Sequence, residues 1–599
     1  MKRFDLRTQQ KIAWGLLILI MVIYMVWMSN QAILRYAIFK ASAFDLGNMD
    51  QVLWNTIHGR FFQFTNQAID WYGPPTRLAI HFEPIILPLS LLYTFHADPR
   101  ILLVFQTLAL VSGALPVFLL TRRYIPEWPI FAPLMATAYL FSPALLGLNI
   151  FDFHPVSLAT PLLLYAILAL TYKRCVWFLI ACTLACMCKE DIPLSVALLG
   201  ILVIWKYKLP RLGLVLLIGG LLWSFLAFKV IIPHFYPGVQ ANNYWYRYEA
   251  LGSSPGAAVA NLIIHPWLLF TTFFTLDRFY YIVGLMRSVG FLSLLSPEWL
   301  LPALPSLAVN LLSTDPLLYS GVYHYNAAII PFVMVSSIHG TRRLIFVWQG
   351  WRQGHPIHLQ QSETEFNLQG AGISPTIETI ALSSSSQSNP ILTTSGSPAN
   401  ALTTSTQLTG GTYIMTLFNS SLLTLFNRMF DQLKPQVLRL TLPAWRHEQW
   451  QRFSARMSPL AKKITIFQLQ WILFTWIVLL IGLNYVIAIP QLNAFWADHT
   501  PGSREEQIQH VLALIPPDAS VSAGMNLNPH LSERQLLAVF PSVCLDPECN
   551  HTVQYVVVDL NNLSIENLAE ATSELNGLSK LYRPLARADG VVLLVRRST

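Results

Sequence analysis

Charged residues are scarce in this chain. Asp, Glu, Lys and Arg make up 12% of its 599 residues, hydrophobic residues make up 54%, and the mean hydropathy is +0.46. A soluble domain carries about 25% charged residues. The deficit excludes an ordinary soluble protein. Apolar runs of about 20 residues, the length needed to cross a bilayer core, indicate a polytopic membrane protein instead.

The chain also lacks a small-residue cleavage site after its first apolar run. Residues 1–11 and 12–28 are patterned like a signal peptide, but without such a site we expect a retained first span. Lys and Arg favour cytoplasmic loops, so the basic start predicts a cytoplasmic N-terminus. The expected spans are residues 12–28, 101–121, 129–148, 156–172, 175–188, 192–205, 211–232, 259–276, 279–296, 325–341 and 465–489. We expect residues 84–95 to be an interfacial helix and the proline-broken segment 297–312 to be re-entrant.

The net charge of +8 does not indicate nucleic-acid binding. Much of it lies between residues 420 and 465, where eight Lys and Arg stand against two acids. Such a basic stretch is typical of a cytoplasmic segment on anionic lipid. We therefore predict membrane lipid, and no nucleic acid, as a partner.

Five parts follow from these patterns. Residues 1–100 are the first span with a long outer loop, 101–346 a transmembrane bundle, 347–464 a low-complexity and basic cytoplasmic insertion, 465–489 the last span and 490–599 an extracytoplasmic domain. In the last part we expect helices at 503–515 and 563–576 and strands at 519–523, 536–540, 553–560 and 590–596. The predicted fold is an all-α polytopic membrane protein with about 11 to 13 transmembrane helices and a small C-terminal α/β domain.

The six cysteines are few and divide into two sets. Cys544 and Cys549 flank a short segment of the outer domain, and we expect them to form a disulfide in an oxidising compartment. The other four lie on one apolar segment and are expected to be buried free thiols rather than a metal site.

Polar residues gather at the predicted outer ends of the spans, where ionisable groups are costly and usually mark function. The candidate site residues, in chain order, are Asp45, Asp50, Arg60, His81, Glu83, Asp152, His154, Lys189, Glu190, His324 and Tyr325. Both Asp45 and Asp50 have a purely structural alternative. Residues 46–58 have helical apolar spacing, Asp45 would cap that amphipathic surface helix, and Asp50 lies about one turn further on. If the bundle packs these groups together, they would line a polar cavity at the outer leaflet.

The sequence resembles a known family at these residues. The run FDLGNMDQVLWNTIHGRFF and the later segments HFEP, DFHP, KED, HYN and IPPDASVSAGMNLNPHLSER resemble the bacterial membrane family called domain of unknown function 2079. The resemblance covers nearly the whole chain except the Ser/Thr-rich insertion. That family in turn is similar to the C-type glycosyltransferases, which take sugars from polyprenyl-phosphate carriers at the outer face of the membrane.

The resemblance implies roles for particular residues. Asp45 holds the place of the catalytic acid in the first outer loop, and Asp152 that of a second acid. A departure is that Asp45 is followed by Leu46, where active relatives carry a paired Asp-Glu. In the implied reaction Asp45, with Asp50 as a second catalytic candidate, takes a proton from the acceptor hydroxyl. Lys189, Arg60, a histidine or a divalent metal would neutralise the leaving phosphate.

The function expected from the sequence is thus a glycosyl transfer from a polyprenyl-phosphate donor to an unknown acceptor at the outer face of the inner membrane. A divalent metal is a conceivable cofactor, with His81, Glu83, Asp152 and His154 as candidate ligands. Two alternatives stay open. One is a transporter or flippase for a lipid-linked or envelope precursor, although no inverted repeat is evident. The other is a non-catalytic membrane protein that binds the envelope through residues 526–534.

Overall fold

A computed structural model of the chain describes residues 5–66, 75–236, 244–353, 444–544, 549 and 551–597. It divides into two compact units. The first comprises residues 1–344 and 467–599, and the second comprises residues 345–466. Most of the predicted cytoplasmic insertion, including its Ser/Thr-rich part, lies outside the described residues.

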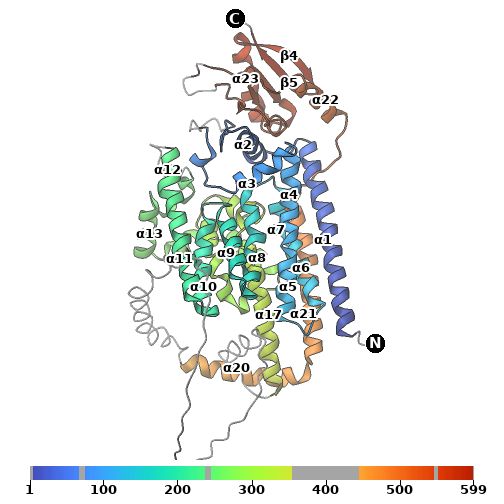
Figure 1. Cartoon of the computed structure of the whole chain (residues 1–599), viewed down its shortest axis with the longest axis vertical. Helices are drawn as coiled ribbons and strands as arrows, with labels where there is room; N and C mark the ends of the chain where they lie inside the picture. Colours follow the sequence, from blue (N-terminus) through green and yellow to red (C-terminus); the bar gives the residue numbers. More distant parts are fainter. Residues whose placement is uncertain are drawn as a thin grey trace, which may run out of the picture. The chain divides into compact units, whose positions relative to one another are not determined.

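The membrane part of the chain is helical, as predicted (Figure 1). Helix α1 packs against α4 and α6, α5 packs against α6 and α8, α8 against α9, and α10 against α11. The α-helices up to the last span are α1 (Leu6–Ala37), α2 (Asn48–Ile57), α3 (Ile86–Ser90), α4 (Pro99–Ser112), α5 (Ala114–Tyr124), α6 (Phe131–Leu140), α7 (Pro143–Ile150), α8 (Ala159–Thr171), α9 (Cys175–Cys186), α10 (Ile192–Tyr207), α11 (Pro210–Leu226), α12 (Ile232–Phe235), α13 (Pro255–Ile264), α14 (Leu268–Phe273), α15 (Leu276–Arg287), α16 (Leu304–Leu311), α17 (Ile330–Gln353), α20 (Ala444–Lys463) and α21 (Ile466–Leu492).

Fewer helices are long enough to span a bilayer than the sequence led us to expect. Among the described residues four apolar helical segments have that length. They are Leu6–Ala37, Pro99–Tyr124 (α4 with α5), Pro210–Phe235 (α11 through α12) and Ile466–Ile487 within α21. The pair α6 and α7 is apolar but bent by 48°, so it forms either a broken fifth span or a re-entrant loop. The segments 155–171, 175–186 and 192–207 form shorter apolar helices. At 1.5 Å per residue a 12-residue helix covers about 18 Å of an approximately 30 Å hydrocarbon core.

Prolines account for several of the breaks. Pro143 opens α7 behind the N-cap Ser142, whose hydroxyl accepts a hydrogen bond from the Leu145 amide. Pro302 lies inside the 3₁₀ segment Pro297–Ala303, which precedes the short helix α16. Proline removes a backbone donor and clashes with the preceding turn, so the helical ladder is interrupted at these points. The predicted re-entrant segment 297–312 is accordingly two short helices.

The C-terminal domain is a five-stranded mixed sheet with the order β2-β1-β3-β5-β4. Strands β1 and β2 and strands β1 and β3 pair in parallel, whereas β3–β5 and β5–β4 are antiparallel. The elements are α22 (Ser503–Leu512), β1 (Val521–Ala523), β2 (Leu537–Val539), β3 (Tyr555–Asp559), α23 (Ile565–Gly577), β4 (Tyr582–Ala588) and β5 (Val591–Arg596).

Both faces of this sheet are buried. Val557 and Leu593 pack with residues of α22, whereas Val556 and Leu594 pack on the opposite side with residues near the end of α23. The four predicted strands and two predicted helices match observed elements. Strand β4 was missed, because this edge strand is largely exposed and carries Pro584 beside a register shift.

The second unit is described only at its two ends. There the last turns of α17 and the helix α20 are in contact: the Ser458 hydroxyl donates to the Trp351 carbonyl at 3.0 Å, and Arg352 donates to the Ile464 carbonyl at 3.0 Å. The basic residues of α20 belong to the stretch expected to lie on anionic lipid.

Candidate functional site

The segment after α1 makes one π-helical turn, Ala43–Gly47, before α2 begins. Ser42 caps this turn by accepting a hydrogen bond from the Phe44 amide at 3.2 Å. Asp45 lies inside the turn, and Gly47, the N-cap residue of α2, provides no side-chain cap. The capping role considered for Asp45 is therefore wrong. Its Oδ1 instead accepts a hydrogen bond from His154 Nε2 at 3.0 Å.

His154 extends this pair toward a second histidine. The imidazole of His154 stacks on that of His324 with ring centroids 4.0 Å apart. Nδ1 of each ring is buried and has no hydrogen-bond partner in the described part of the chain. Burial lowers the pKa of His324 well below its ordinary value, and the nearby charge of His154 acts in the same direction. His324 is therefore neutral at pH 7.

Asp152 is the second acid of this group, and it is completely buried. Its carboxylate accepts hydrogen bonds from the Arg35 guanidinium and, at 2.7 Å, from the Ser42 amide. Burial raises the pKa of Asp152, as does the nearby Asp45, and Arg35 offsets only part of this. Burial also raises the pKa of Asp45, but the hydrogen bond and charge of His154 outweigh it and leave this pKa lowered.

The environments of the two acids therefore differ in a way that suggests different roles. The Asp45 side chain is 23% exposed and ionised at neutral pH, whereas the Asp152 side chain is 0% exposed. Neighbouring carboxyls whose pKa values are pushed apart commonly divide acid, base and structural roles. Asp45 is the one that a substrate can reach, and Asp152 fixes the end of α1 to the segment that carries His154.

A second polar group forms around Glu190. His81 Nδ1 donates to Glu190 Oε1 at 2.8 Å, and the Phe82 amide donates to the other carboxylate oxygen at 3.1 Å. Burial raises the pKa of Glu190, but His81 and then Lys189 outweigh it and lower the pKa to about 2. Close by, Arg77 donates two hydrogen bonds to the Glu83 carboxylate, from Nε at 2.8 Å and from Nη2 at 3.4 Å.

Lys189 connects the two groups electrostatically. Burial lowers the pKa of Lys189, but Asp191 and Glu190 outweigh it and raise the pKa. Its Nζ lies 4.0 Å from Asp191. Tyr325, whose ring is 4.3 Å from that of His324, lies within electrostatic range of Lys189 and of Arg247.

The structure thus joins most of the predicted site residues into one connected set. His324 lies within electrostatic range of His154, His81 and Lys189, so it belongs to both groups. Residues of five separate sequence segments take part. The joined residues are Asp45, His81, Glu83, Asp152, His154, Lys189, Glu190, His324 and Tyr325.

Asp50 and Arg60 lie elsewhere. The Asp50 carboxylate accepts hydrogen bonds from the hydroxyls of Tyr93 and Ser532, both at 2.5 Å, and is 0% exposed. Arg60 donates to Asn55 at 2.8 Å, and its guanidinium lies 5.3 Å from the Trp54 ring. Among the described residues neither shows a contact with the Asp45 group. Catalysis by Asp50 and substrate binding by Arg60 therefore stay predictions.

The four candidate metal ligands do not form one ligand set. His81 binds Glu190, Glu83 binds Arg77, Asp152 binds Arg35 and His154 binds Asp45. Across the described residues, no group of three or more His, Cys, Asp and Glu side chains could hold a metal ion. The residues present therefore do not fit the divalent metal considered from the sequence, and no step below is assigned to one.

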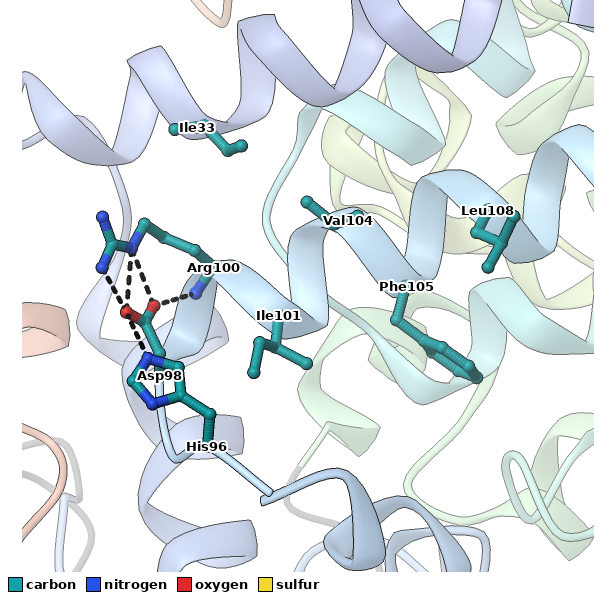
Figure 2. Close-up of a pocket in the computed structure, with 8 residues that line it drawn as sticks. All are labelled: Ile33, His96, Asp98, Arg100, Ile101, Val104, Phe105 and Leu108. Atoms are coloured by element: carbon teal, nitrogen blue, oxygen red, sulfur yellow. Dashed lines mark hydrogen bonds and ion pairs between the residues drawn. The ribbon is translucent and has the colours of Figure 1, made fainter. Parts of the chain in front are cut away.

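A pocket of about 540 Å³ lies away from this set, between α1 and α4 (Figure 2). Ile33, Ile101, Val104, Phe105 and Leu108 give it apolar walls. At one end Arg100 binds Asp98, and His96 lies beside them. None of the predicted site residues lines this pocket.

Sequence reasoning missed several residues of the site. Arg35 was overlooked because it lies within the first long helix, although an arginine so close to the end of a span is itself a signal. Arg77 lies four residues before His81 and pairs with Glu83. Arg247 lies in the aromatic run YWYRYEA. Its Nε is 3.1 Å from Asp315 Oδ2, and its guanidinium carbon lies 4.7 Å from the centroid of the Tyr244 ring.

The cysteines are arranged in two sets. Cys544 and Cys549 are joined by a disulfide, with Cα atoms 4.8 Å apart. Cys182, Cys186 and Cys188 are buried free thiols, and Cys175 is free and exposed. Buried free thiols behave as small apolar side chains, so these three have a packing role.

Comparison with known proteins gives a family but no described relative. No curated protein and no solved structure matches the chain significantly. The family described as predicted membrane protein (DUF2079) matches residues 35–419 and 445–593. The match includes the Ser/Thr-rich segment, which the resemblance had left out, and every residue of the candidate site. With its apolar helices and the match over most of its length, this chain is a membrane protein that belongs to the DUF2079 family.

Proposed function

We propose that the protein is a glycosyltransferase that moves a sugar from a polyprenyl-phosphate donor to an acceptor hydroxyl. The observation that carries this proposal is the contact between Asp45 and His154. It provides a partly exposed, ionised carboxylate with a fixed orientation, surrounded by buried polar groups. A positioned base of this kind is what the transfer of a hydroxyl proton requires.

In the proposed reaction the acceptor oxygen forms a bond to the anomeric carbon while the bond from that carbon to the phosphate oxygen breaks. The electron pair of the broken bond leaves with the polyprenyl phosphate, and the hydroxyl proton passes to Asp45. Because the pKa of Asp45 is lowered, this transfer becomes favourable only as the new bond forms and acidifies the hydroxyl. Asp45 rather than His154 faces the substrate, since the free Nδ1 of His154 is buried.

The leaving phosphate needs positive charge. Lys189 stays protonated, and with Arg247 it lies within electrostatic range of Tyr325. Asp191 and Asp315 partly compensate the two cations. An arriving phosphate would therefore compete with these carboxylates, and a preorganised cation at such a site contributes several kcal/mol to the stabilisation of developing charge.

The disulfide supports an extracytoplasmic location for this site. Disulfides persist in oxidising compartments such as the bacterial periplasm. The domain that contains Cys544–Cys549 makes hydrogen bonds to residues 43–66, the segment that includes Asp45. We therefore assign the Asp45 end to the outer face of the inner membrane, with a cytoplasmic N-terminus.

The test is Asp45→Asn in protein reconstituted into liposomes with a radiolabelled polyprenyl-phosphate sugar. Asparagine retains an oxygen acceptor for His154 but cannot take the proton. We expect transfer to fall by about 10² or more while donor binding is retained. Asp498→Asn is the matched control, because Asp498 is an exposed acid that pairs with Lys40 outside the site. Equal transfer by the Asp45→Asn variant and the wild type would overturn the proposal.

A further inference from the structure

One motif has no role in the proposed chemistry. It is the segment Met525–Arg534, with sequence MNLNPHLSER, in the C-terminal domain. We call it the clamp segment, and we call residues 42–51, which include Asp45, the catalytic loop. The two meet directly, because the Ala43 amide donates to the Met525 carbonyl at 3.1 Å.

Two asparagines form the centre of this contact. Asn66 and Asn528 exchange hydrogen bonds between their amide groups, at 2.8 and 2.6 Å, and both are 0% exposed. Asn66 also donates to the Ala43 carbonyl at 2.9 Å. Gly47 allows this approach, since a Cβ atom there would lie 2.5 Å from Asn528 Oδ1.

The other end of the catalytic loop is held as well. Ser532 donates to Asp50, and Gln51 donates to the Arg534 carbonyl at 3.1 Å. Arg534 is itself fixed within the domain by its hydrogen bond to the Ala519 carbonyl at 2.8 Å. The polar face of α2, which was expected to face solvent on the membrane surface, is therefore covered by the C-terminal domain.

A third contact fixes the end of α1. His530 stacks on Tyr36 with centroids 4.0 Å apart and donates from Nε2 to the Tyr36 carbonyl at 3.0 Å. Phe39 is 2% exposed and packs in the same hydrophobic cluster as Leu527 and Leu531. Burial lowers the pKa of His530 to about 3, so this histidine is a neutral donor at pH 7.

We propose that the C-terminal domain is a positioning clamp for Asp45 rather than an independent module on a tether. The clamp segment holds the chain before Asp45 at Ala43 and after it at Gly47, Asp50 and Gln51. Completely buried polar groups that satisfy one another across two parts of a chain are costly to separate, which argues against a tethered domain. The consequence for the reaction rests on the proposed function of Asp45.

Position matters because a misplacement of about 1 Å at a catalytic group can lower a rate by about 10². The Asn528 side chain is completely buried and bonds to Asn66 and the Ala538 carbonyl, so we treat it as a positioning residue. Its neighbour Asn526 is a natural control: its side chain donates to Asp559 inside the same domain, at 3.0 Å. The two residues are two positions apart, but only Asn528 reaches Asn66.

The experiment compares Asn528→Ala and Gly47→Ala with Asn526→Ala in the full-length protein in lipid nanodiscs. Hydrogen exchange of residues 42–51 is measured beside the kcat and KM of transfer. For Asn528→Ala and Gly47→Ala we expect loop exchange about 10-fold faster and kcat about 10-fold lower, with donor KM little changed. Gly47→Ala leaves the domain sequence intact, so domain misfolding cannot explain its effect. Asn526→Ala should leave loop exchange unchanged.

The outcomes separate this inference from the proposed function. Unchanged loop exchange in both Asn528→Ala and Gly47→Ala overturns the clamp, whatever happens to transfer. If Asn528→Ala and Gly47→Ala show faster loop exchange but full kcat, and Asp45→Asn is inactive, the positioning role is overturned and the proposed function is retained. If Asp45→Asn is fully active, the proposed function fails, and loop exchange alone decides whether the domain holds the loop.

Discussion

The hydrogen bond between Asp50 and Ser532 should make the clamp depend on pH. Burial raises the pKa of Asp50 to about 7, although the hydroxyls of Ser532 and Tyr93 partly offset this. Burial and the charge of Asp50 raise the pKa of Glu533 to about 8. Asp98 adds negative charge near both, and Arg100 adds positive charge near Glu533.

The direction of the pKa shifts of Asp50 and Glu533 determines how the stability of the clamp changes with pH. A carboxyl whose pKa is higher in the closed state than in the open one stabilises the closed state at low pH. That contribution is complete below about pH 4 and is lost as the pH rises to about 7 for Asp50 and about 8 for Glu533. The rise of the Asp50 pKa from 3.8 to about 7 corresponds to a loss of about 4 kcal/mol in the stability of the closed state relative to the open one, complete at the upper end of this pH range.

The perturbation is Asp50→Asn, which keeps hydrogen-bonding capacity toward Tyr93 and Ser532 but removes the ionisation. Hydrogen exchange of residues 42–51, corrected for intrinsic exchange, is measured at pH 5.5 and pH 8 in nanodiscs. We expect protection in the wild type to fall at least tenfold over this interval, since one pKa unit is a factor of ten. In Asp50→Asn the fall should be clearly smaller. An equal pH dependence in both proteins would refute the reasoning.

Two further predictions concern the site and the topology. Lys189→Gln should lower transfer by 10² or more with normal insertion, because it removes a cation assigned to the leaving phosphate; full activity would remove Lys189 from the mechanism. A single cysteine at position 580 should react with a membrane-impermeant maleimide in intact spheroplasts, and one at position 400 should react only after lysis. The reverse pattern would overturn the assigned orientation.

Much of the fold could be predicted from residue patterns. The alternating run ASVSA located the buried strand Val521–Ala523, a continuous apolar run located Val591–Arg596, and longer apolar runs located helices of the membrane part. The exposed edge strand β4 lacked such a pattern. Periodicity also could not show that the polar side of α2 would be covered, because that depends on a domain more than 470 residues away.

The candidate site was only partly readable for a similar reason. An acid or histidine at the end of a span is visible in the sequence, so Asp45, His154 and His324 were found. The sequence did not show which of them pair, and it did not reveal Arg35, because the ion pair of Arg35 with Asp152 joins residues 117 positions apart. Asp45 and Asp50 looked alike in sequence, and only the contacts separate an accessible carboxylate from one buried against Ser532.

The most direct test of the central claim is whether the purified protein consumes a polyprenyl-phosphate sugar. Wild-type protein and Asp45→Asn are each incubated in proteoliposomes with the radiolabelled donor and a membrane extract as the source of acceptor. With the wild type we expect label to leave the lipid carrier and appear in a new product, and with Asp45→Asn we expect this to be slower by a factor of about 10² or more. Label that stays on the carrier with the wild type, or that leaves equally fast with both, would contradict it.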